Sequence, residues 1–200
     1  MTMSTFDIVC VTSRRLCAEP IEVRIARLLS GGISRVILRE KDLSPREYAE
    51  LAEKVLKYNN FDKRISLHFY PEVCKALNYK RLHVSVQTLI NDENIRKSVD
   101  FMGASVHSPE EAQAAETLGA DYVIAGHIFE TDCKKGLPPR GLSFLKNICE
   151  NVSIPVYAIG GITENNISRI RQSGAGGACL MSNLMRCENT DEYVRKLVKC

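Results

Sequence analysis

The sequence predicts a single-domain α/β fold over residues 1–200, a (β/α)₈ TIM barrel, and three observations predict it. Short apolar runs alternate with longer amphipathic runs along the whole chain, and eight strand candidates can be counted. Their spacing, about 25 residues per strand and helix, suits a barrel near the lower size limit. No GxGxxG phosphate motif follows the first strand, which disfavours a doubly wound sheet, the competing architecture.

Each predicted strand is short, and all but Ile65–Phe69 end in a polar residue or glycine. Strands are expected at Ile8–Thr12, Arg35–Glu40, Ile65–Phe69, Leu82–Ser85, Phe101–His107, Tyr122–His127, Val156–Gly160 and Ala178–Ser182. In a barrel of this kind the active site lies where the strands run into their following loops. We call this end of the barrel the mouth and look for functional residues there.

The amphipathic runs between the strands predict helices. The clearest is Pro45–Leu56, which has an apolar face at helical spacing, Ser44 as its N-cap and Glu47 three residues after the cap. Similar start signals occur at Ser108 and, less strongly, at Thr163. Later helices are expected at Leu142–Glu150 and Asp191–Lys199.

Composition excludes several classes of protein. The net charge of +3 is small and dispersed, and no basic run of five residues occurs, so nucleic acid is not an expected partner. No apolar run is long enough to span a bilayer, and the N-terminus shows no secretion signal. The eight cysteines form no CxxC pair, which suits a reducing, cytoplasmic location. Any bound anion is expected to be small.

A polar loop, Gly126–Gly141, follows the sixth strand and is longer than a simple strand-to-helix link requires. It begins with His127, which closes the strand and is our candidate for a catalytic residue. A histidine can also be a satisfied structural group, and that alternative stays open. Cys133 beside Lys134 is conceivable as a nucleophile, but spacing places no base for it.

Two cations, Arg39 and Lys41, follow the second strand. Alternation along a strand sends both to the same side, which predicts an anion site at the mouth. The competing interpretation is a pair of surface salt bridges to Glu40 and Asp42.

Glycine and serine at the ends of the last two strands predict phosphate binding through backbone N–H groups. Gly160 and Gly161 follow the seventh strand, and Met181 and Ser182 follow the eighth, where barrels often hold a phosphate. Alternatively, the two glycines only make a tight turn.

Four histidines near strand ends could in principle gather a metal. They show no HxH or HxxxH spacing and no joining carboxylate or thiolate, so no metal and no cofactor are expected. Ser105, in the fifth strand, could either point its hydroxyl into the mouth or fill the upper layer of the barrel.

Taken together, several of these segments resemble the thiamine phosphate synthase superfamily over nearly the whole chain. The matching segments are Leu38–Asp42, Ser105–Glu111, Gly119–Val123, Lys134–Lys135 and Val156–Gly161. The resemblance implies a (β/α)₈ barrel, a role in thiamin biosynthesis and a homodimer or higher homo-oligomer. One branch of the family, the synthases, joins a pyrimidine diphosphate to a thiazole phosphate and needs Mg²⁺. The other, the thiazole tautomerases of the TenI branch, aromatises the thiazole before that coupling.

Two departures from the synthase pattern favour the tautomerase branch. Where synthases carry an Asn-Asp pair and an Asp as metal-site residues, this chain reads His68–Pro71 and Ser85–Thr88, with Glu72 and Asp92 the nearest acids. Mg²⁺ prefers hard oxygen ligands, so this loss argues against the synthase reaction. Where synthases usually have proline, this chain has His127, and the segment Gly126–Gly136 is similar to the tautomerase motif.

The resemblance therefore implies an isomerase that converts 2-carboxythiazolylidene ethyl phosphate to carboxythiazole phosphate without a metal. An imidazole can both take and return a proton near neutral pH, so His127 is expected to move the proton. The expected contacts with this small-molecule substrate are Arg39, Lys41, Ser105, Thr131 and Lys134, with Gly160, Gly161, Met181 and Ser182 at its phosphate. Three alternatives remain: a synthase-like transferase, a non-catalytic sensor of phosphate ligands, and another sugar-phosphate isomerase on the same fold.

Overall fold

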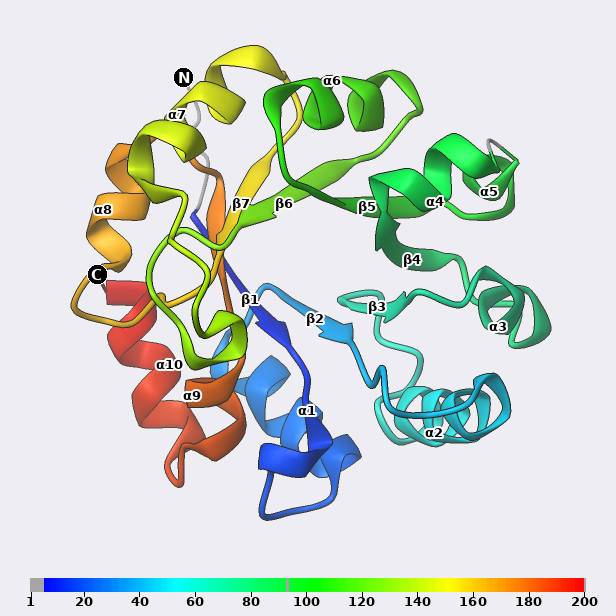
Figure 1. The fold of residues 1–200 in the computed structure, drawn as a ribbon. Helices are drawn as coiled ribbons and strands as arrows, with labels where there is room; N and C mark the ends of the chain where they lie inside the picture. Colours follow the sequence, from blue (N-terminus) through cyan, green and yellow to red (C-terminus); the bar gives the residue numbers. More distant parts are fainter. Residues whose placement is uncertain (1–5, 93, 200) are drawn as a thin grey trace, which may run out of the picture.

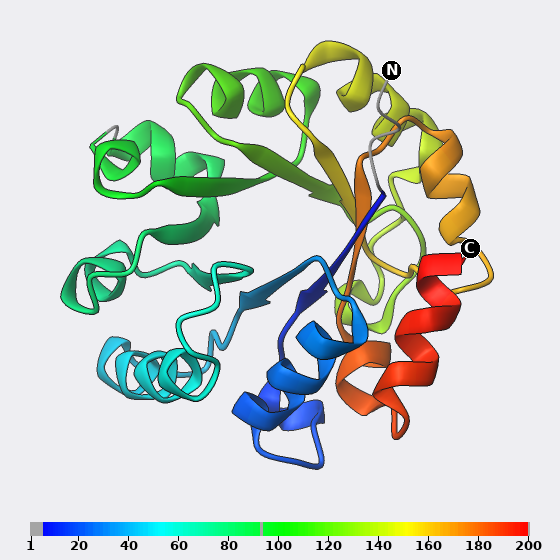
Figure 2. The same cartoon turned by 180° about the vertical axis from the view of Figure 1, so that it is seen from behind.

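The computed structural model describes residues 6–92 and 94–199, in which eight parallel strands close into a barrel in sequence order. The predicted single-domain (β/α)₈ barrel is confirmed. Figures 1 and 2 view the barrel from its two ends, with the helices arranged around the outside. The strands are β1 (Asp7–Val11), β2 (Arg35–Leu38), β3 (Ile65–His68), β4 (Arg81–Ser85), β5 (Phe101–Val106), β6 (Tyr122–Gly126), β7 (Val156–Ile159) and β8 (Gly177–Leu180).

All eight predicted strands are present, but most of them end one or two residues earlier than predicted. His127, for example, lies just after β6, and Glu40 lies two residues after β2. The polar residues and glycines at these ends leave the hydrogen-bonded ladder and begin the loops of the mouth. The shift therefore moves the candidate residues out of the strands and into those loops.

The helices pack around the strands. They are η1 (Arg14–Leu16), α1 (Ile21–Gly31), α2 (Pro45–Tyr58), α3 (Pro71–Ala76), α4 (Val86–Asn91), α5 (Ile95–Ser98), α6 (Pro109–Thr117), η2 (Asp132–Lys134), α7 (Gly141–Asn151), α8 (Ile167–Gln172), α9 (Ser182–Arg186) and α10 (Thr190–Lys199). In the part of the chain that the structure describes, no helix has both the length and the apolar character needed to cross a membrane.

Helix α2 begins as its sequence predicts. The Ser44 side chain accepts a hydrogen bond from the Glu47 N–H, and the Glu47 carboxylate accepts one from the Ser44 N–H. This reciprocal pair satisfies two N–H groups that a helix start otherwise leaves unpaired. The buried face of the helix then packs Tyr48, Val55 and Leu56 against the strands.

Helix α8 begins later than predicted, at Ile167 rather than after Thr163. The Thr163 carbonyl accepts a hydrogen bond from the Asn166 N–H, while the Asn166 side chain accepts one from the Thr163 N–H. The Thr163 carbonyl also accepts a hydrogen bond from the Ile167 N–H at 3.0 Å, which has helical spacing, so the turn at Thr163 leads directly into the helix. The predicted start signal at Thr163 is therefore present, and only the regular helix begins later, at Ile167.

The core has two layers. The larger lies between the strands and the surrounding helices, and the smaller fills the inside of the barrel. The inner layer consists of Val9, Val11, Ile37, Tyr122, Ile124, Tyr157 and Cys179, with Phe101, Ile159 and Met181 packed against it. A filled interior leaves the mouth as the place where a ligand can reach the strand ends.

Candidate active site

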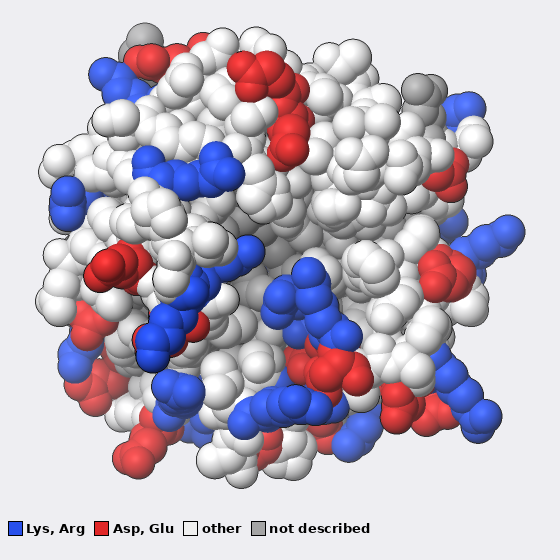
Figure 3. All heavy atoms as spheres, in the orientation of Figure 1, with Lys and Arg blue, Asp and Glu red and all other residues white. Residues whose placement is uncertain are grey.

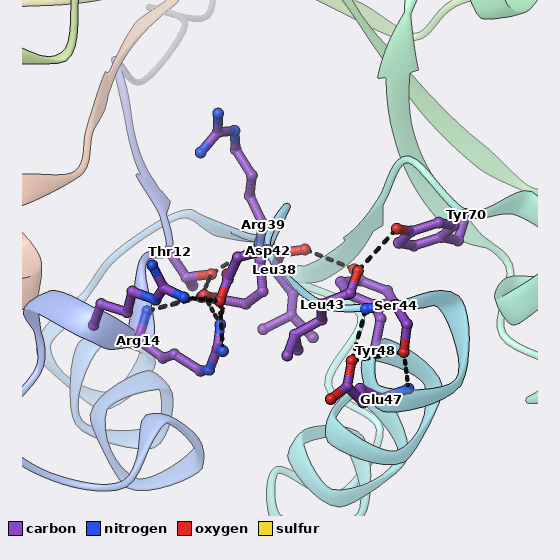
Figure 4. A network of polar contacts seen from close by, with 12 residues as sticks. Thr12, Arg14, Leu38, Arg39, Asp42, Leu43, Ser44, Glu47, Tyr48 and Tyr70 are labelled. Carbon is purple, nitrogen blue, oxygen red and sulfur yellow. Dashed lines mark hydrogen bonds and ion pairs between the residues drawn. The ribbon is translucent and has the colours of Figure 1, made fainter.

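A buried carboxylate joins the loops that follow β1 and β2. Glu40 is 3% exposed and accepts hydrogen bonds from the Thr12 hydroxyl at 2.7 Å and the Arg14 N–H at 2.9 Å. The Arg14 guanidinium also contacts Glu40 at 3.1 Å and both oxygens of Asp42 at 2.7 Å. We call Thr12, Arg14, Glu40 and Asp42 the carboxylate clamp; Figure 4 shows most of this network.

The clamp decides how the two cations after β2 are used. The alternative that Arg39 and Lys41 pair with Glu40 and Asp42 is wrong, because these acids are taken by Arg14 and, at 2.9 Å from Asp42, by Arg15. Within residues 6–92 and 94–199, no hydrogen bond or ion pair is made by the side chain of Arg39 or Lys41. The Arg39 side chain points away from the clamp (Figure 4).

A third cation, Lys134, lies close enough to this pair to affect its charge. Partial burial, followed by the charges of Arg39 and Lys134, lowers the pKa of Lys41 below its ordinary value. Lys and Arg side chains gather on the left and lower sides of the central hollow of this face in Figure 3. Unpaired cations that repel one another favour an anionic ligand, because the ligand relieves the repulsion.

His127 is held on the opposite part of the mouth, directly after β6. It is half-buried, and its Nε2 lies 3.3 Å from the carbonyl oxygen of Leu137 further along the same loop. The next two residues continue the contact with β7, since the Ile128 N–H donates to Ile159 O at 2.9 Å and the Phe129 N–H to Gly160 O at 3.0 Å. These backbone hydrogen bonds fix the position of the main chain that carries the His127 imidazole.

Gly160 and Gly161 make room for this loop. Their φ angles are +102° and +65°, and a side chain at either position would collide with the chain at His127 or with Phe129 and Glu130. Turn geometry and close packing therefore account for both glycines. In the described part of the chain, their N–H groups are paired with no acceptor, which leaves them free for a phosphate. The phosphate role itself stays a prediction.

The remaining predicted contacts are spread around the mouth. Met181 packs against the inner core and precedes α9, whose first residue is Ser182. Thr131 caps η2, its hydroxyl accepting from the Cys133 N–H at 3.4 Å, and Lys134 ends that short helix. Thr131 thus has a local structural role that sequence reasoning missed.

Ser105 meets a histidine that the sequence singled out only as a possible metal ligand. The Ser105 hydroxyl lies 2.8 Å from Nε2 of His83, which is 2% exposed, and the His83 ring stacks on His68 with centroids 5.8 Å apart. Burial lowers the pKa of His83 to about 3, and burial with the charges of His83, Arg39 and Lys41 lowers that of His68 to about 2. Both imidazoles are neutral at neutral pH.

A cavity of about 160 Å³ adjoins Lys41 on the β3 side of the mouth. It is lined by Glu40, Lys41, Tyr48, His68, Phe69 and Tyr70. Its single acid, Glu40, already belongs to the carboxylate clamp. No group of three or more His, Cys, Asp or Glu side chains placed to hold a metal ion occurs in the ranges 6–92 and 94–199.

Comparisons with known proteins agree with this architecture. The thiamine-phosphate synthase of Syntrophomonas wolfei is 30% identical over 208 residues, covering 98% of this chain and 97% of that protein. The one from Methanococcus maripaludis is 32% identical over 202 residues, covering 94% and 95%. The solved thiamine phosphate pyrophosphorylase from Pyrococcus furiosus is 30% identical, with a TM-score of 0.81, and the match covers 98% of this chain and 95% of that one.

The family model described as thiamine monophosphate synthase matches residues 8–184, which is most of the barrel. On this match, and on relatives that are similar over almost their whole length, the chain belongs to the thiamine monophosphate synthase family.

Proposed function

We propose that this chain is an enzyme of thiamin biosynthesis and, within that role, a thiazole tautomerase that acts on 2-carboxythiazolylidene ethyl phosphate. One observation carries the choice: in the described residues the mouth combines three cations that have no acidic partner with a histidine at a strand end, whereas Glu40 and Asp42 are engaged in the carboxylate clamp. Such a site suits a substrate with two anionic groups and a reaction that only moves a proton.

The proposed reaction needs one base that returns the proton it takes. A neutral His127 removes the proton from C2 of the substrate ring, becomes an imidazolium, and donates the proton to the exocyclic carbon, so the sum is an isomerisation with no co-reactant. A carbonyl oxygen can only accept, so the contact with Leu137 O assigns the ring proton to Nε2. Nδ1 is then the nitrogen that takes the substrate proton.

The other groups of the mouth bind and orient the substrate in this proposal. Arg39 takes the ring carboxylate with its planar guanidinium, and Lys41 and Lys134 neutralise the remaining charge. The free N–H groups of Gly160 and Gly161, with the start of α9, hold the phosphate. The homo-oligomeric state and cytoplasmic location expected from the sequence stay predictions.

The synthase reaction is the second candidate, and the names of the relatives favour it. That reaction needs Mg²⁺, which the side chains after β3 and β4 do not fit. The described positions offer imidazole, aromatic and hydroxyl groups at His68, Phe69 and Ser85, where a magnesium site requires carboxylate oxygens. We therefore derive no step through a metal.

Two assays on the purified protein separate the candidates. In the first, the carboxythiazolylidene phosphate is followed by proton NMR with EDTA present, and we expect aromatisation well above the spontaneous rate. In the second, Mg²⁺, the pyrimidine diphosphate and the thiazole phosphate are supplied together, and we expect no coupled product. Coupling without aromatisation would replace the proposal with the synthase. If neither reaction occurs, the protein would instead be a non-catalytic binding protein.

A further inference from the structure

A chain of buried polar groups runs inside the barrel beneath the mouth. The Tyr122 hydroxyl lies 3.1 Å from Nδ1 of His83, and Nε2 of the same ring lies 2.8 Å from the Ser105 hydroxyl. Tyr122 is 1% exposed and His83 2% exposed, whereas Ser105 is half-buried and ends the chain on the side of the mouth. The first two side chains therefore do not reach a ligand themselves.

The three strands that carry these groups are neighbours, with β5 between β4 and β6. Gly103 on β5 lies opposite both His83 on β4 and Tyr122 on β6. A side chain at Gly103 would collide with the Tyr122 ring, so this glycine provides the space in which the phenol reaches the imidazole. This series of hydrogen-bonded side chains is thus fixed by the packing of three neighbouring strands and does not depend on one flexible side chain.

The direction of the hydrogen bonds follows from the acceptor that is available to the buried Tyr122 hydroxyl proton. A neutral imidazole has one N–H and one lone pair, so His83 donates at one end and accepts at the other. If Nδ1 donated to Tyr122, the phenolic proton would need another acceptor. In the described residues the other polar group near the Tyr122 hydroxyl is the buried Ser66 hydroxyl, which interacts with Tyr122 as a donor and has no other partner. If Tyr122 donated to Ser66 instead, the Ser66 proton would be left without an acceptor. An unpaired buried proton is costly, so Tyr122 donates to Nδ1.

We infer that Tyr122 and His83 fix the direction of the Ser105 hydroxyl, so that it donates its proton to an acceptor atom of the substrate. Nε2–H of His83 donates to the Ser105 oxygen, and the serine proton turns toward the mouth. Tyr122 and His83 are positioning residues, and Ser105 selects a carboxylate oxygen or an unprotonated ring nitrogen over an amino group. The identity of that acceptor rests on the proposed function, but the direction of the chain does not.

The direction can be measured without any substrate. Long-range proton–nitrogen NMR spectra of ¹⁵N-histidine-labelled protein distinguish the two neutral tautomers, and a His83→Gln variant assigns the signal. We expect the proton on Nε2 in the wild type and a mixture of tautomers in Tyr122→Phe, because Nδ1 loses its donor. A wild-type His83 protonated on Nδ1 would overturn the inference.

The predicted effect on ligand binding can be tested with a double mutant. We expect Tyr122→Phe and Ser105→Ala each to weaken carboxythiazole phosphate binding about 3- to 10-fold in calorimetric titration. The double variant should bind no worse than Ser105→Ala, because both changes remove the same hydrogen bond. Tyr157→Phe is the matched control, because it removes a tyrosine hydroxyl of the same inner layer that donates to Asp7 at 2.6 Å, and it should change neither the tautomer nor the affinity.

The outcomes separate this inference from the proposed function. The Nε2 tautomer with non-additive losses of affinity, in a protein that fails to aromatise the ylidene, would retain the chain and discard the tautomerase. Strictly additive losses in the two variants would show that Tyr122 acts through general packing, and would overturn the positioning role even in an active enzyme.

Discussion

The two sides of the barrel mouth use polar residues in different ways. On the β1–β2 side, the buried Glu40 binds Arg14 and Thr12, and this arrangement leaves Arg39 and Lys41 without acidic partners. On the β6–β7 side, His127 is placed by backbone hydrogen bonds and by glycines that allow close packing. The first side supplies permanent positive charge and the second supplies a group that can exchange a proton.

The comparison teaches that residue type alone does not define a role. Arg14 and Arg39 follow neighbouring strands, yet Arg14 is engaged by two carboxylates and Arg39 by none in the described residues. Only the pairing tells which cation holds the fold together and which can bind a ligand. If the account is right, substitutions on the two sides should affect different kinetic constants.

The largest effect is expected on the proton-transferring side. His127→Asn should lower kcat about 10²- to 10⁴-fold, because it removes the base, while the affinity for carboxythiazole phosphate changes little. Stopped assays for kcat and calorimetry for affinity measure the two quantities. His107→Asn, at the exposed end of β5, is the control and should keep both. Equal losses in the two variants would remove the distinction between the sides.

The clamp should matter for stability and, through it, for binding. Glu40→Gln keeps the shape but removes the charge that pairs with Arg14, and we expect a loss of about 1.5–3 kcal/mol in the free energy of unfolding. KM should rise as well, because the β2 loop is no longer held. Urea titration and steady-state kinetics test this, with Asp42→Asn, at the exposed end of the clamp, expected to have the smaller effect.

A smaller and more specific effect is expected for the unpaired cation. Arg39→Gln should raise KM about 10-fold and leave kcat nearly unchanged, because it removes ground-state and transition-state binding alike. Arg15→Gln is the matched control: the Arg15 side chain is 72% exposed and, among the described residues, pairs only with Asp42, so KM should stay close to that of the wild type. A loss of kcat with unchanged KM in Arg39→Gln would contradict its binding role.

The last effect concerns the buried imidazole beneath the mouth and is the smallest near neutral pH, because it appears only as the pH falls. The pKa of His83 is lowered to about 3, so between about pH 6.5 and 3 the unfolded chain binds a proton that the native protein does not. Stability should therefore fall as the pH falls through this window, by at most about 1.4 kcal/mol per pH unit for this residue. His83→Gln should flatten the pH dependence of the unfolding free energy, measured by urea titration at several pH values in this window.

Much of the fold could be predicted because it depends on local patterns. Apolar runs and capping residues such as Ser44 report secondary structure within a few residues, and eight repeats indicate a closed barrel. His127 and Arg39 could be placed at the mouth because strand ends are readable from the chain.

The pairings could not be predicted because they join distant positions. Thr12 and Glu40 are 28 residues apart, and His83 and Tyr122 are 39 apart. Alternation indicates that His83 points inward, but not which neighbour it meets across two strands. Gly160 shows the same limit, since the sequence suggests a phosphate contact or a turn and only the structure shows His127 packed against it.

Chemical rescue tests the central claim, that an imidazole at position 127 moves the proton, most directly. His127→Ala is assayed for aromatisation of the carboxythiazolylidene phosphate, with EDTA, in the absence and presence of added imidazole. We predict that the variant is nearly inactive and still binds carboxythiazole phosphate. Its turnover should rise in proportion to the concentration of added imidazole in its neutral, basic form. A variant that turns over like the wild type, or a folded and ligand-binding variant that imidazole does not rescue, would contradict the account.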